Sequence, residues 1–489
     1  MRQRFEQEHQ TILGLIQISD AEIPIKSRDA VPGLIATLKA IFINSEFNQK
    51  IFKILEEKIT TGKKKTGRTG MSLWQIFVLA QFRLTLNISY DRLHLMANYD
   101  TLLRQIMGIE TESGFKKIEI KYQNILDNVS LLDDKIVKEL NDVIVELGHG
   151  TFKKKETEAL DCKTDSFVLE SNVHFPTDYN LLWDCARKCL DTVSYFLEKY
   201  PDITGWRKIS DWERGMKNGM RSLGQAMRSG GIGKEDRVKK ESEKYLVKAK
   251  ALRNKLIDSK ANIIIQDAID LANAVALDRF IELLNKHIDL VDRRLIKGET
   301  IPHEEKIFSI FEDYTEWINK GKLNPNVELG KKIAITTDQF HLIVDYRIMD
   351  HQADSEIVES ISERLLSLFK IHSWSFDKGF YHKNNKSLLE KEIERVIMPK
   401  KGKCNAQEKE EERSKIFVKL RHKHSAIESN INELEHRGLD RCPDRGYEHF
   451  KSYVGLAVSA YNLRRIGKQL IKNMQEEEDI KKYKLRLSA

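Results

Sequence analysis

The hydrophobic pattern in the first third of the chain is helical. Apolar residues recur at every third or fourth position over three segments, 34–47, 49–59 and 73–84. Two short helices are predicted next, because Ser89 and Asp100 are residue types that cap helix N-termini. Short helices that follow a long one are typical of a helix-turn-helix-like bundle. We therefore expect residues 1–150 to form an all-α DNA-binding region.

The pattern changes near residue 159. Short apolar runs at 159–163 and 167–170 predict two strands, and helical periodicity then returns from 181 to about 297. Strands are expected again at 331–337 and 340–346, with Asp338-Gln339 between them as a tight hairpin turn. The remaining expected elements are a helix at 354–369, a strand leading to Asp377, a helix at 386–392, a strand at 395–398, and helices at 407–436 and 447–474.

This order predicts a mixed α/β fold. Without the helical stretch 191–300, the elements are three strands, a helix, a strand, a helix, a strand and a helix. That is the order of an RNase H-like domain with a mixed five-stranded sheet, here interrupted by a large helical insertion. The expected boundaries are 1–150 for the helical DNA-binding region, 151–190 and 301–474 for the catalytic domain, 191–300 for the insertion, and 475–489 for a charged tail.

Composition favours a folded protein with a polyanionic partner. The 489 residues are 40% hydrophobic and 32% charged, and the formal net charge is +8. Many proteins are mildly basic, so charge alone does not establish a nucleic-acid partner. The chain has no apolar run of 18 residues and no signal-peptide pattern, so no membrane association is expected. Five scattered cysteines indicate a reducing cytoplasm, and Cys185 and Cys189 are expected to be core thiols rather than zinc ligands.

Three acidic residues carry the candidate chemistry. Asp165 and Asp377 each follow an apolar, strand-like run, and Glu428 lies in a basic helix. Two Asp and a later Glu are the ligands that a two-metal site for phosphodiester cleavage requires, with two cations about 4 Å apart. Three carboxylates brought together repel one another unless cations neutralise them. These residues are therefore predicted to be both catalytic and metal-binding.

Each of these acids alone has a simpler interpretation, because an Asp after a strand is usually a turn or cap residue. The prediction depends on all three occurring in this order. Asp161 competes with Asp165 as the first ligand if the strand is unbroken, since the two would then share a face. Asp354 is expected to cap the helix that it precedes.

Two basic groups are candidates for DNA binding. The first lies in the glycine-rich segment 60–70, which is either a solvated linker or an arm along phosphates. Its cations are Lys63, Lys64, Lys65 and Arg68. The second group is Arg421 and His424, seven and four residues before Glu428 on the expected helix face. They would either hold a scissile phosphate or form a solvated basic face. The glycine-rich stretch 228–234 lacks P-loop spacing and is predicted to be a turn.

Several motifs give the chain a family resemblance. Residues 165–178, followed by Leu181-Leu182-Trp183-Asp184, resemble the first catalytic block of bacterial insertion-sequence transposases, most similarly the ISNCY group, relatives of the IS-five-like families. The further matching segments are 308–312, 316–322, 377–381, 398–403, and 426–428 ahead of 438–442. The resemblance extends from about residue 70 to the C-terminus. It implies that the family's acidic triad falls on Asp165, Asp377 and Glu428.

The resemblance implies a DDE transposase, but one feature departs from its relatives. Some of them place a Tyr and an Arg before the Glu and a Lys after it on one helix face. Here Arg421 and His424 precede Glu428, and Arg437 follows nine residues later, so the helper cations are not assigned.

The implied activity is cleavage and joining of double-stranded DNA. The enzyme would bind the terminal inverted repeats of its own element as a homodimer in a paired-end complex. It would use two Mg²⁺ ions, with Mn²⁺ as a substitute, to activate water, and the freed 3′-hydroxyl would attack target DNA. A bacterial, cytoplasmic, nucleoid-associated protein is expected. The alternatives are an RNase H-fold nuclease or resolvase and a non-catalytic DNA-binding protein derived from a transposase.

Overall fold

The computed structural model describes Arg4 and residues 17–61, 70–109, 118–201, 203, 205–260, 262–319 and 326–488. The chain divides into two units, which are considered separately. The first, here called the sheet unit, combines Met1–Asn172 with Ile318–Ala489. The second, the helical unit, is Val173–Trp317, a longer stretch than the expected insertion at 191–300.

The sheet is mixed, as the sequence predicts, but it has seven strands rather than five. The strands are β1 (Leu160–Ser171), β2 (Glu316–Asn319), β3 (Val327–Thr337), β4 (Ile343–Ile348), β5 (Ile371–Phe376), β6 (Arg395–Ile397) and β7 (Arg441–Cys442). Their order is β2-β3-β1-β5-β6, with β4 paired to β3 and β7 paired to β1. The pairs β1–β3 and β3–β4 are antiparallel, whereas β1–β5 and β5–β6 are parallel. The prediction missed β2 and β7, which are too short to give a clear pattern.

Strand β1 is continuous where two strands were predicted. Its polar centre stays extended because β3 pairs with it from Lys163 to Glu170 without interruption. The hydroxyls of Thr164 and Thr336 also hydrogen-bond across the pair at 2.7 Å. Asp165 therefore lies in the middle of β1, opposite Ile335, and the prediction that it ends a strand is wrong.

The connection between β3 and β4 is also longer than the predicted two-residue turn. It covers 338–342, and the Asp338 carboxylate organises it by accepting hydrogen bonds from the backbone N–H groups of Phe340 (2.8 Å) and Leu342 (2.9 Å). His341 adopts a left-handed φ of 63°. The side chain of Asp338 thus adds to the backbone hydrogen bonds of the connection, which the Asp338 N–H donates to the Leu342 carbonyl (3.0 Å) and the His341 N–H donates to the Asp338 carbonyl (3.2 Å).

The two faces of the sheet differ in chemistry. Alternate residues of β1 and β5, namely Cys162, Trp374 and Phe376, point into an apolar core that includes residues of α12 (Val358–Leu368) and α13 (Lys383–Leu389). The opposite face is covered by α15 (Lys415–His424), which packs on β5, and α16 (Ala426–Leu434), which packs on β1.

The single helix expected at 407–436 is divided into several elements. These are α14 (Ala406–Arg413), α15, α16 and the π-helical turn η6 (Glu435–Leu439). Ser414 separates α14 from α15 and accepts a hydrogen bond from the Phe417 N–H, which makes it the N-cap of α15. Ser425 separates α15 from α16, so His424 and Glu428 lie on different helices.

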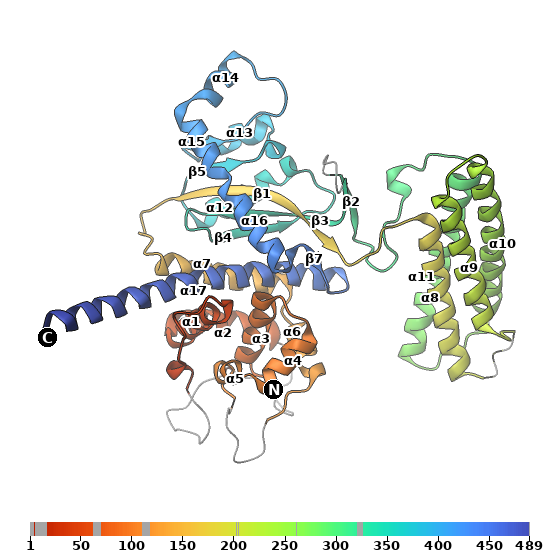
Figure 1. The fold of residues 1–489 in the computed structure, drawn as a ribbon, viewed down its shortest axis with the longest axis horizontal. Coiled ribbons are helices and arrows are strands. Elements are labelled where there is room, and N and C mark those ends of the chain that lie inside the picture. Colours follow the sequence, from red (N-terminus) through yellow and green to blue (C-terminus); the bar gives the residue numbers. More distant parts are fainter. Residues whose placement is uncertain are drawn as a thin grey trace. The chain divides into compact units, whose positions relative to one another are not determined.

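The N-terminal helices pack with the C-terminal one in the sheet unit. They are α1 (Ala30–Ile43), α2 (Ser45–Ile59), α3 (Leu73–Leu86), α4 (Tyr90–Tyr99), α5 (Thr101–Ile106), α6 (Tyr122–Val129), α7 (Asp134–Thr151) and α17 (Tyr447–Ser488). Helices α7 and α17 lie between the sheet and the other helices (Figure 1). Helix α17 passes α1 so closely that a Cβ at Gly467 would lie 2.0 Å from the Gly33 carbonyl oxygen, so this crossing requires glycine. Ser89 and Asp100 cap α4 and α5 as predicted.

The remaining short helical turns are η1 (Ile18–Asp20), η2 (Asp292–Ile296), η3 (His303–Glu305), η4 (Asp354–Glu356) and η5 (Lys378–Phe380). Among the described residues, no single helix is long and apolar enough to cross a membrane, although the bent pair α1 and α2 passes that test together.

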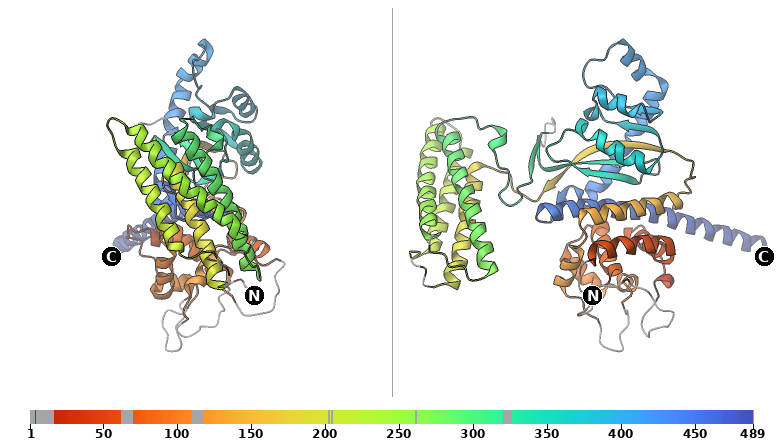
Figure 2. Two further views of the ribbon diagram at one scale, coloured as in Figure 1. Left: turned by 90° about the vertical axis from the view of Figure 1, so that its right-hand side faces the viewer. Right: turned by 180° about the vertical axis from the view of Figure 1, so that it is seen from behind.

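The helical unit contains four long helices that run side by side (Figure 2). They are α8 (Asp178–Lys199), α9 (Ile209–Arg228), α10 (Lys234–Lys260) and α11 (Ala268–Val291). Cys185 and Cys189 are fully buried in its apolar core, as predicted for core thiols. The glycine-rich stretch after Arg228 forms a turn between α9 and α10.

A buried polar network joins two helices of this unit. Asp270, at the start of α11, is fully buried and accepts hydrogen bonds from the hydroxyls of Tyr195 and Tyr200 and from Lys199 Nζ, all at the end of α8.

Candidate active site

Strand register brings Asp165 and Asp377 to the same level of the sheet. In the parallel pair β1–β5, Thr164 lies opposite Phe376, which is the last residue of β5. Asp165 and Asp377 are each one residue further along these neighbouring strands. Because side chains alternate between faces, both point away from the apolar core and toward the face covered by α15 and α16. Asp165 lies in the middle of β1 but has no β5 residue beside it, because β5 ends at Phe376.

The electrostatics of Asp165 place other acids close to it. Burial, together with the negative charges of Asp377, Asp354 and Glu428, raises the pKa of the Asp165 carboxyl from 3.8 to about 6. A hydrogen bond from the Ser166 N–H to Asp165 Oδ1, at 2.7 Å, opposes this rise. The ionised form is therefore disfavoured by low solvation and by like charges.

Glu428 reaches this region from a separate element. It lies in the first turn of α16, which packs against β1, and its side chain is exposed. Asp165, Asp377 and Glu428 are called the acidic cluster below. Within the described ranges, no member of this cluster forms an ion pair with a Lys, Arg or His side chain. Clustered carboxylates without a compensating cation fit a divalent metal, which prefers oxygen ligands.

Asp354 is a fourth acid at the site, and its observed role differs from the predicted helix cap. Its carboxylate accepts hydrogen bonds from Ser166 Oγ (2.8 Å) and Lys332 Nζ (2.8 and 2.9 Å). It also lies beside Gly379, where an added Cβ would be 2.8 Å from Asp354 Oδ2. Lys332 forms an ion pair with this acid, which distinguishes it from the acidic cluster. The sequence does not reveal this contact, because Lys332 and Ser166 are remote from Asp354 along the chain.

The alternative first ligand, Asp161, is engaged elsewhere. Its carboxylate accepts a hydrogen bond from Ser373 Oγ at 2.6 Å and lies 3.1 Å from His372 Nδ1. Burial alone would raise the pKa of Asp161, but these contacts with Ser373 and His372 outweigh it and lower the pKa. Asp161 therefore lies beside β5, whereas Asp165, four residues later, lies beyond the end of that strand.

His424 is at the site but without the expected positive charge. Its Nδ1 lies 3.0 Å from Ser375 Oγ, and its Nε2 is buried without a hydrogen-bond partner. Burial lowers the pKa of this imidazole to about 4, against the opposing charge of Asp377. The side chain is therefore neutral near pH 7. Arg421 is exposed on α15, on the other side of the break at Ser425 from Glu428.

A cavity of about 350 Å³ continues from this region along β1 and β5. Lys163, two residues before Asp165 on the same face, lines it together with Lys423 of α15 and Ser429 of α16. Burial lowers the pKa of the Lys163 ammonium. The cavity therefore combines two cationic side chains with the carboxylate of Asp161, which also lines it, an arrangement that the sequence analysis did not identify.

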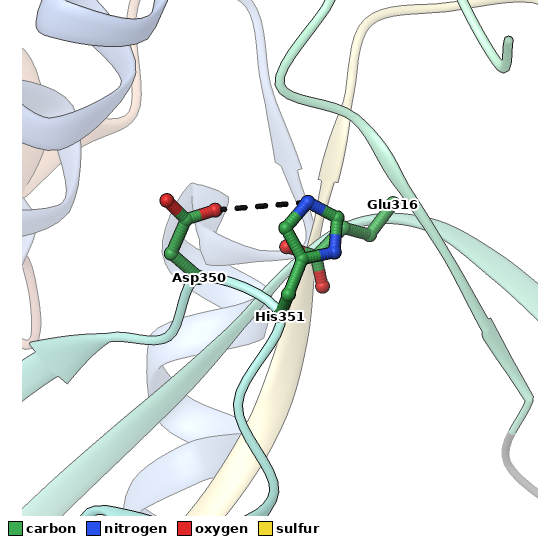
Figure 3. A group of neighbouring side chains, drawn as sticks. All are labelled: Glu316, Asp350 and His351. Atoms are coloured by element: carbon green, nitrogen blue, oxygen red, sulfur yellow. Dashed lines mark ion pairs between the residues drawn. The ribbon is translucent and has the colours of Figure 1, made fainter. Parts of the chain in front are cut away.

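Figure 3 shows a second group of side chains of kinds that bind metal ions, Glu316, Asp350 and His351. We assign no metal site to this group. His351 Nε2 lies 4.0 Å from Asp350 Oδ1, both side chains are exposed, and Lys331 already pairs with Asp350. Glu316 belongs to the helical unit, whereas Asp350 and His351 belong to the sheet unit.

The basic arm is outside the part of the chain that the structure describes. Lys63, Lys64, Lys65 and Arg68 all fall within 62–69. Their role in DNA binding stays a prediction from the sequence.

Part of the chain matches a known protein family. No curated protein and no solved structure gives a significant match to the chain. Residues 290–463 match the family described as "Transposase DDE domain". This range contains Asp377 and Glu428 and begins after β1, so Asp165 lies before it. The mixed sheet is consistent with an RNase H-like transposase domain, and the family match supports a DDE transposase.

Proposed function

We propose that this chain is a DNA transposase that cleaves phosphodiester bonds at the ends of its own insertion sequence and joins them to target DNA. One observation supports this chemistry: Asp377 and Glu428 are near enough to Asp165 for their charges to help raise its pKa, and none of the three forms an ion pair with a cation among the described residues. The transposase family match supports the same activity.

The three carboxylates have defined roles in this proposal. Asp165 in β1 and Asp377, which directly follows β5, would hold the metal ions from neighbouring positions of the sheet. Glu428, exposed on a short helix that packs against β1, would supply the third carboxylate. Divalent cations, Mg²⁺ or Mn²⁺, supply charge neutralisation and Lewis acidity when bound. Lys332 forms an ion pair with Asp354, and this fourth acid orients Ser166 next to Asp165.

The proposed DNA partners are the terminal inverted repeats and the target duplex, with two protomers pairing two ends. The resemblance to the ISNCY group supports a bacterial insertion sequence as the source, with the protein acting at the nucleoid. Two cations in the adjoining cavity, Lys163 and Lys423, favour the passage of a phosphate backbone next to the acidic cluster.

The role of the cluster is tested with Asp377→Asn. The amide keeps the side-chain volume but removes the charge that holds a cation, so Mg²⁺-dependent nicking of a plasmid carrying the element's ends should be abolished while DNA binding persists. Asp313→Asn, at an exposed position of the helical unit, is the matched control. Retained cutting by Asp377→Asn refutes the proposed role. Loss of cutting by Asp161→Asn but not by Asp165→Asn would reassign the first ligand.

The basic arm has its own test. Replacing Lys63, Lys64, Lys65 and Arg68 with Ala should weaken binding about equally for all DNA sequences. It should also reduce the salt dependence by up to about four counterions, because each phosphate contact releases about one counterion. An unchanged salt slope would identify the arm as a linker.

A nuclease or resolvase with the same fold is the alternative enzyme. It would cut DNA with the same acids but would not join a 3′-hydroxyl to a new strand. A strand-transfer assay with pre-cleaved ends therefore separates the two functions, since only a transposase should yield joined products.

A further inference from the structure

A short acidic helix of the sheet unit takes no part in the proposed chemistry. It is α14 (Ala406–Arg413), whose sequence is AQEKEEER, and it lies next to α15 (Figure 1). Every residue of this helix is at least partly exposed. Burial of apolar side chains therefore does not hold α14 in place, and an isolated helix of this length is marginal in water.

Three glutamates bind α14 to the rest of the sheet unit. Glu411 forms an ion pair with Lys386 of α13, with 2.6 Å between Lys386 Nζ and each carboxylate oxygen. Glu408 pairs with Lys400 in the same bidentate way, at 2.7 and 2.8 Å. Glu412 Oε1 accepts a hydrogen bond from the Lys400 N–H at 2.8 Å. Positions three and four apart share a helix face, so α14 turns one acidic face toward two lysines.

The two lysines lie near the end of the sheet where Asp377 lies. Strands β5 and β6 are parallel, with Ser375 opposite Ile397. Asp377 follows the end of β5 and Lys400 follows the end of β6, so both come from the same edge of the sheet. Lys386 is in α13, the first α-helix after Asp377. Cations in this place suit the phosphates of a duplex that reaches the acidic cluster.

Cations of the neighbouring helix α15 are not covered in this way. Lys415, Lys419 and Lys423 are exposed, and none of them forms an ion pair in the part of the chain that the structure describes. The side chains of Lys386 and Lys400, by contrast, are only 18% and 26% exposed, with the carboxylates of α14 against them. The acidic helix therefore masks two lysines beside a row of unpaired ones.

The attachment of α14 is weak enough to be reversible. Partly exposed ion pairs contribute little to stability and weaken as salt rises. The chain changes direction on both sides of the helix, at Gly402 with a φ of 101° and at Ser414, where α15 begins. A line of phosphates carries more negative charge than three glutamates and can replace them on the lysines.

We propose that α14 is a detachable acidic strap, which covers Lys386 and Lys400 in the DNA-free protein and leaves when a DNA backbone takes its place. The strap lowers the affinity of the protein for DNA of any sequence, because each lysine must exchange a carboxylate for a phosphate. The inference rests on the proposed function in taking DNA as the competing polyanion.

The test measures binding of the full chain to a short duplex of arbitrary sequence in EDTA, where no cutting occurs. Glu411→Gln keeps the side-chain shape but releases Lys386, so it should tighten binding by about threefold, the ordinary strength of one surface ion pair. It should also steepen the salt dependence of binding, because salt no longer weakens a competing ion pair.

Two further variants make the outcome specific. Glu410→Gln removes the same charge from the same helix, but Glu410 has no ion pair within the described ranges, so this control should bind DNA as the wild type does. Lys386→Gln combined with Glu411→Gln should cancel the threefold gain, because no lysine is left to release.

Hydrogen exchange measures the release itself. Backbone amides of α14 should exchange faster when the duplex is added, because the detached helix is too short to persist, whereas those of α16 should not. Raising NaCl from about 50 mM to about 500 mM without DNA should also speed exchange in α14, since the ion pairs are screened.

Equal affinities of the wild type, Glu411→Gln and Glu410→Gln would overturn the proposal, as would a gain that persists when Lys386→Gln is present. Absence of DNA binding by every variant would instead contradict the proposed function. The strap would then be judged by salt alone, and exchange in α14 that does not change with salt would overturn it.

Discussion

Replacing Asp165 with Asn should stabilise the metal-free protein while abolishing its chemistry. Burial raises the pKa of this carboxyl most, and the charges of Asp377, Asp354 and Glu428 add to the rise, to about 6. The amide has the same shape, and its oxygen can still accept the 2.7 Å hydrogen bond from the Ser166 N–H. The substitution removes only the unfavourable charge, so the variant should be more stable than the wild type at every pH at which Asp165 is ionised.

The magnitude follows from the raised pKa. The rise from 3.8 to about 6 corresponds to about 3 kcal/mol, at about 1.4 kcal/mol per pH unit. Solvent screening of this half-buried group reduces the expected effect to about 1–2 kcal/mol. Since the folded state holds the proton more tightly than the unfolded state, the wild type loses this stability as pH rises from about 4 through about 6. Asp165→Asn does not titrate and should be the more stable protein at pH 8, but not at pH 4.

Urea unfolding at pH 4 and pH 8 in EDTA measures this difference, with exposed Asp313→Asn as the control. Addition of Mg²⁺ should then stabilise the wild type and not the variant, because only the intact cluster binds the ion in the folded state. Equal stability of wild type and Asp165→Asn at pH 8 would show that neither burial nor the neighbouring acids disfavour the ionised carboxylate, and would refute the cluster.

Three other predictions concern residues around the site and the helical unit. Burial lowers the pKa of His424 to about 4, so the wild type should lose about 1–2 kcal/mol between pH 7 and pH 5 relative to His424→Gln, as urea unfolding would reveal; equal losses would place this imidazole in water. Gly379→Ala should push the Asp354 carboxylate aside and slow nicking, whereas Gly150→Ala, with open space around it, should not. Asp270→Asn should lower the melting temperature of the protein by calorimetry, because the buried network between α8 and α11 loses its charged acceptor; an unchanged transition would contradict that role.

Local rules explain why much of the fold is predictable. Helical periodicity and side-chain caps act within a few residues, so α1 to α5, with the caps Ser89 and Asp100, follow from the sequence. The strand-helix order from β3 to β6 follows for the same reason. Strand ends are less predictable because pairing partners decide them. The polar run around Asp165 resembles a break, but β3 pairs across it and keeps it extended.

The sequence by itself identified Asp165, Asp377 and Glu428 as candidate ligands, because hard cations need oxygen ligands and few residue types supply them. Tertiary structure alone decided that Asp165 lies in mid-strand, beside the end of β5 at Phe376. It also decided that Asp354 forms an ion pair with Lys332 and that His424 is uncharged. Charge state and repulsion depend on burial and on neighbours remote in the chain, which no local pattern encodes.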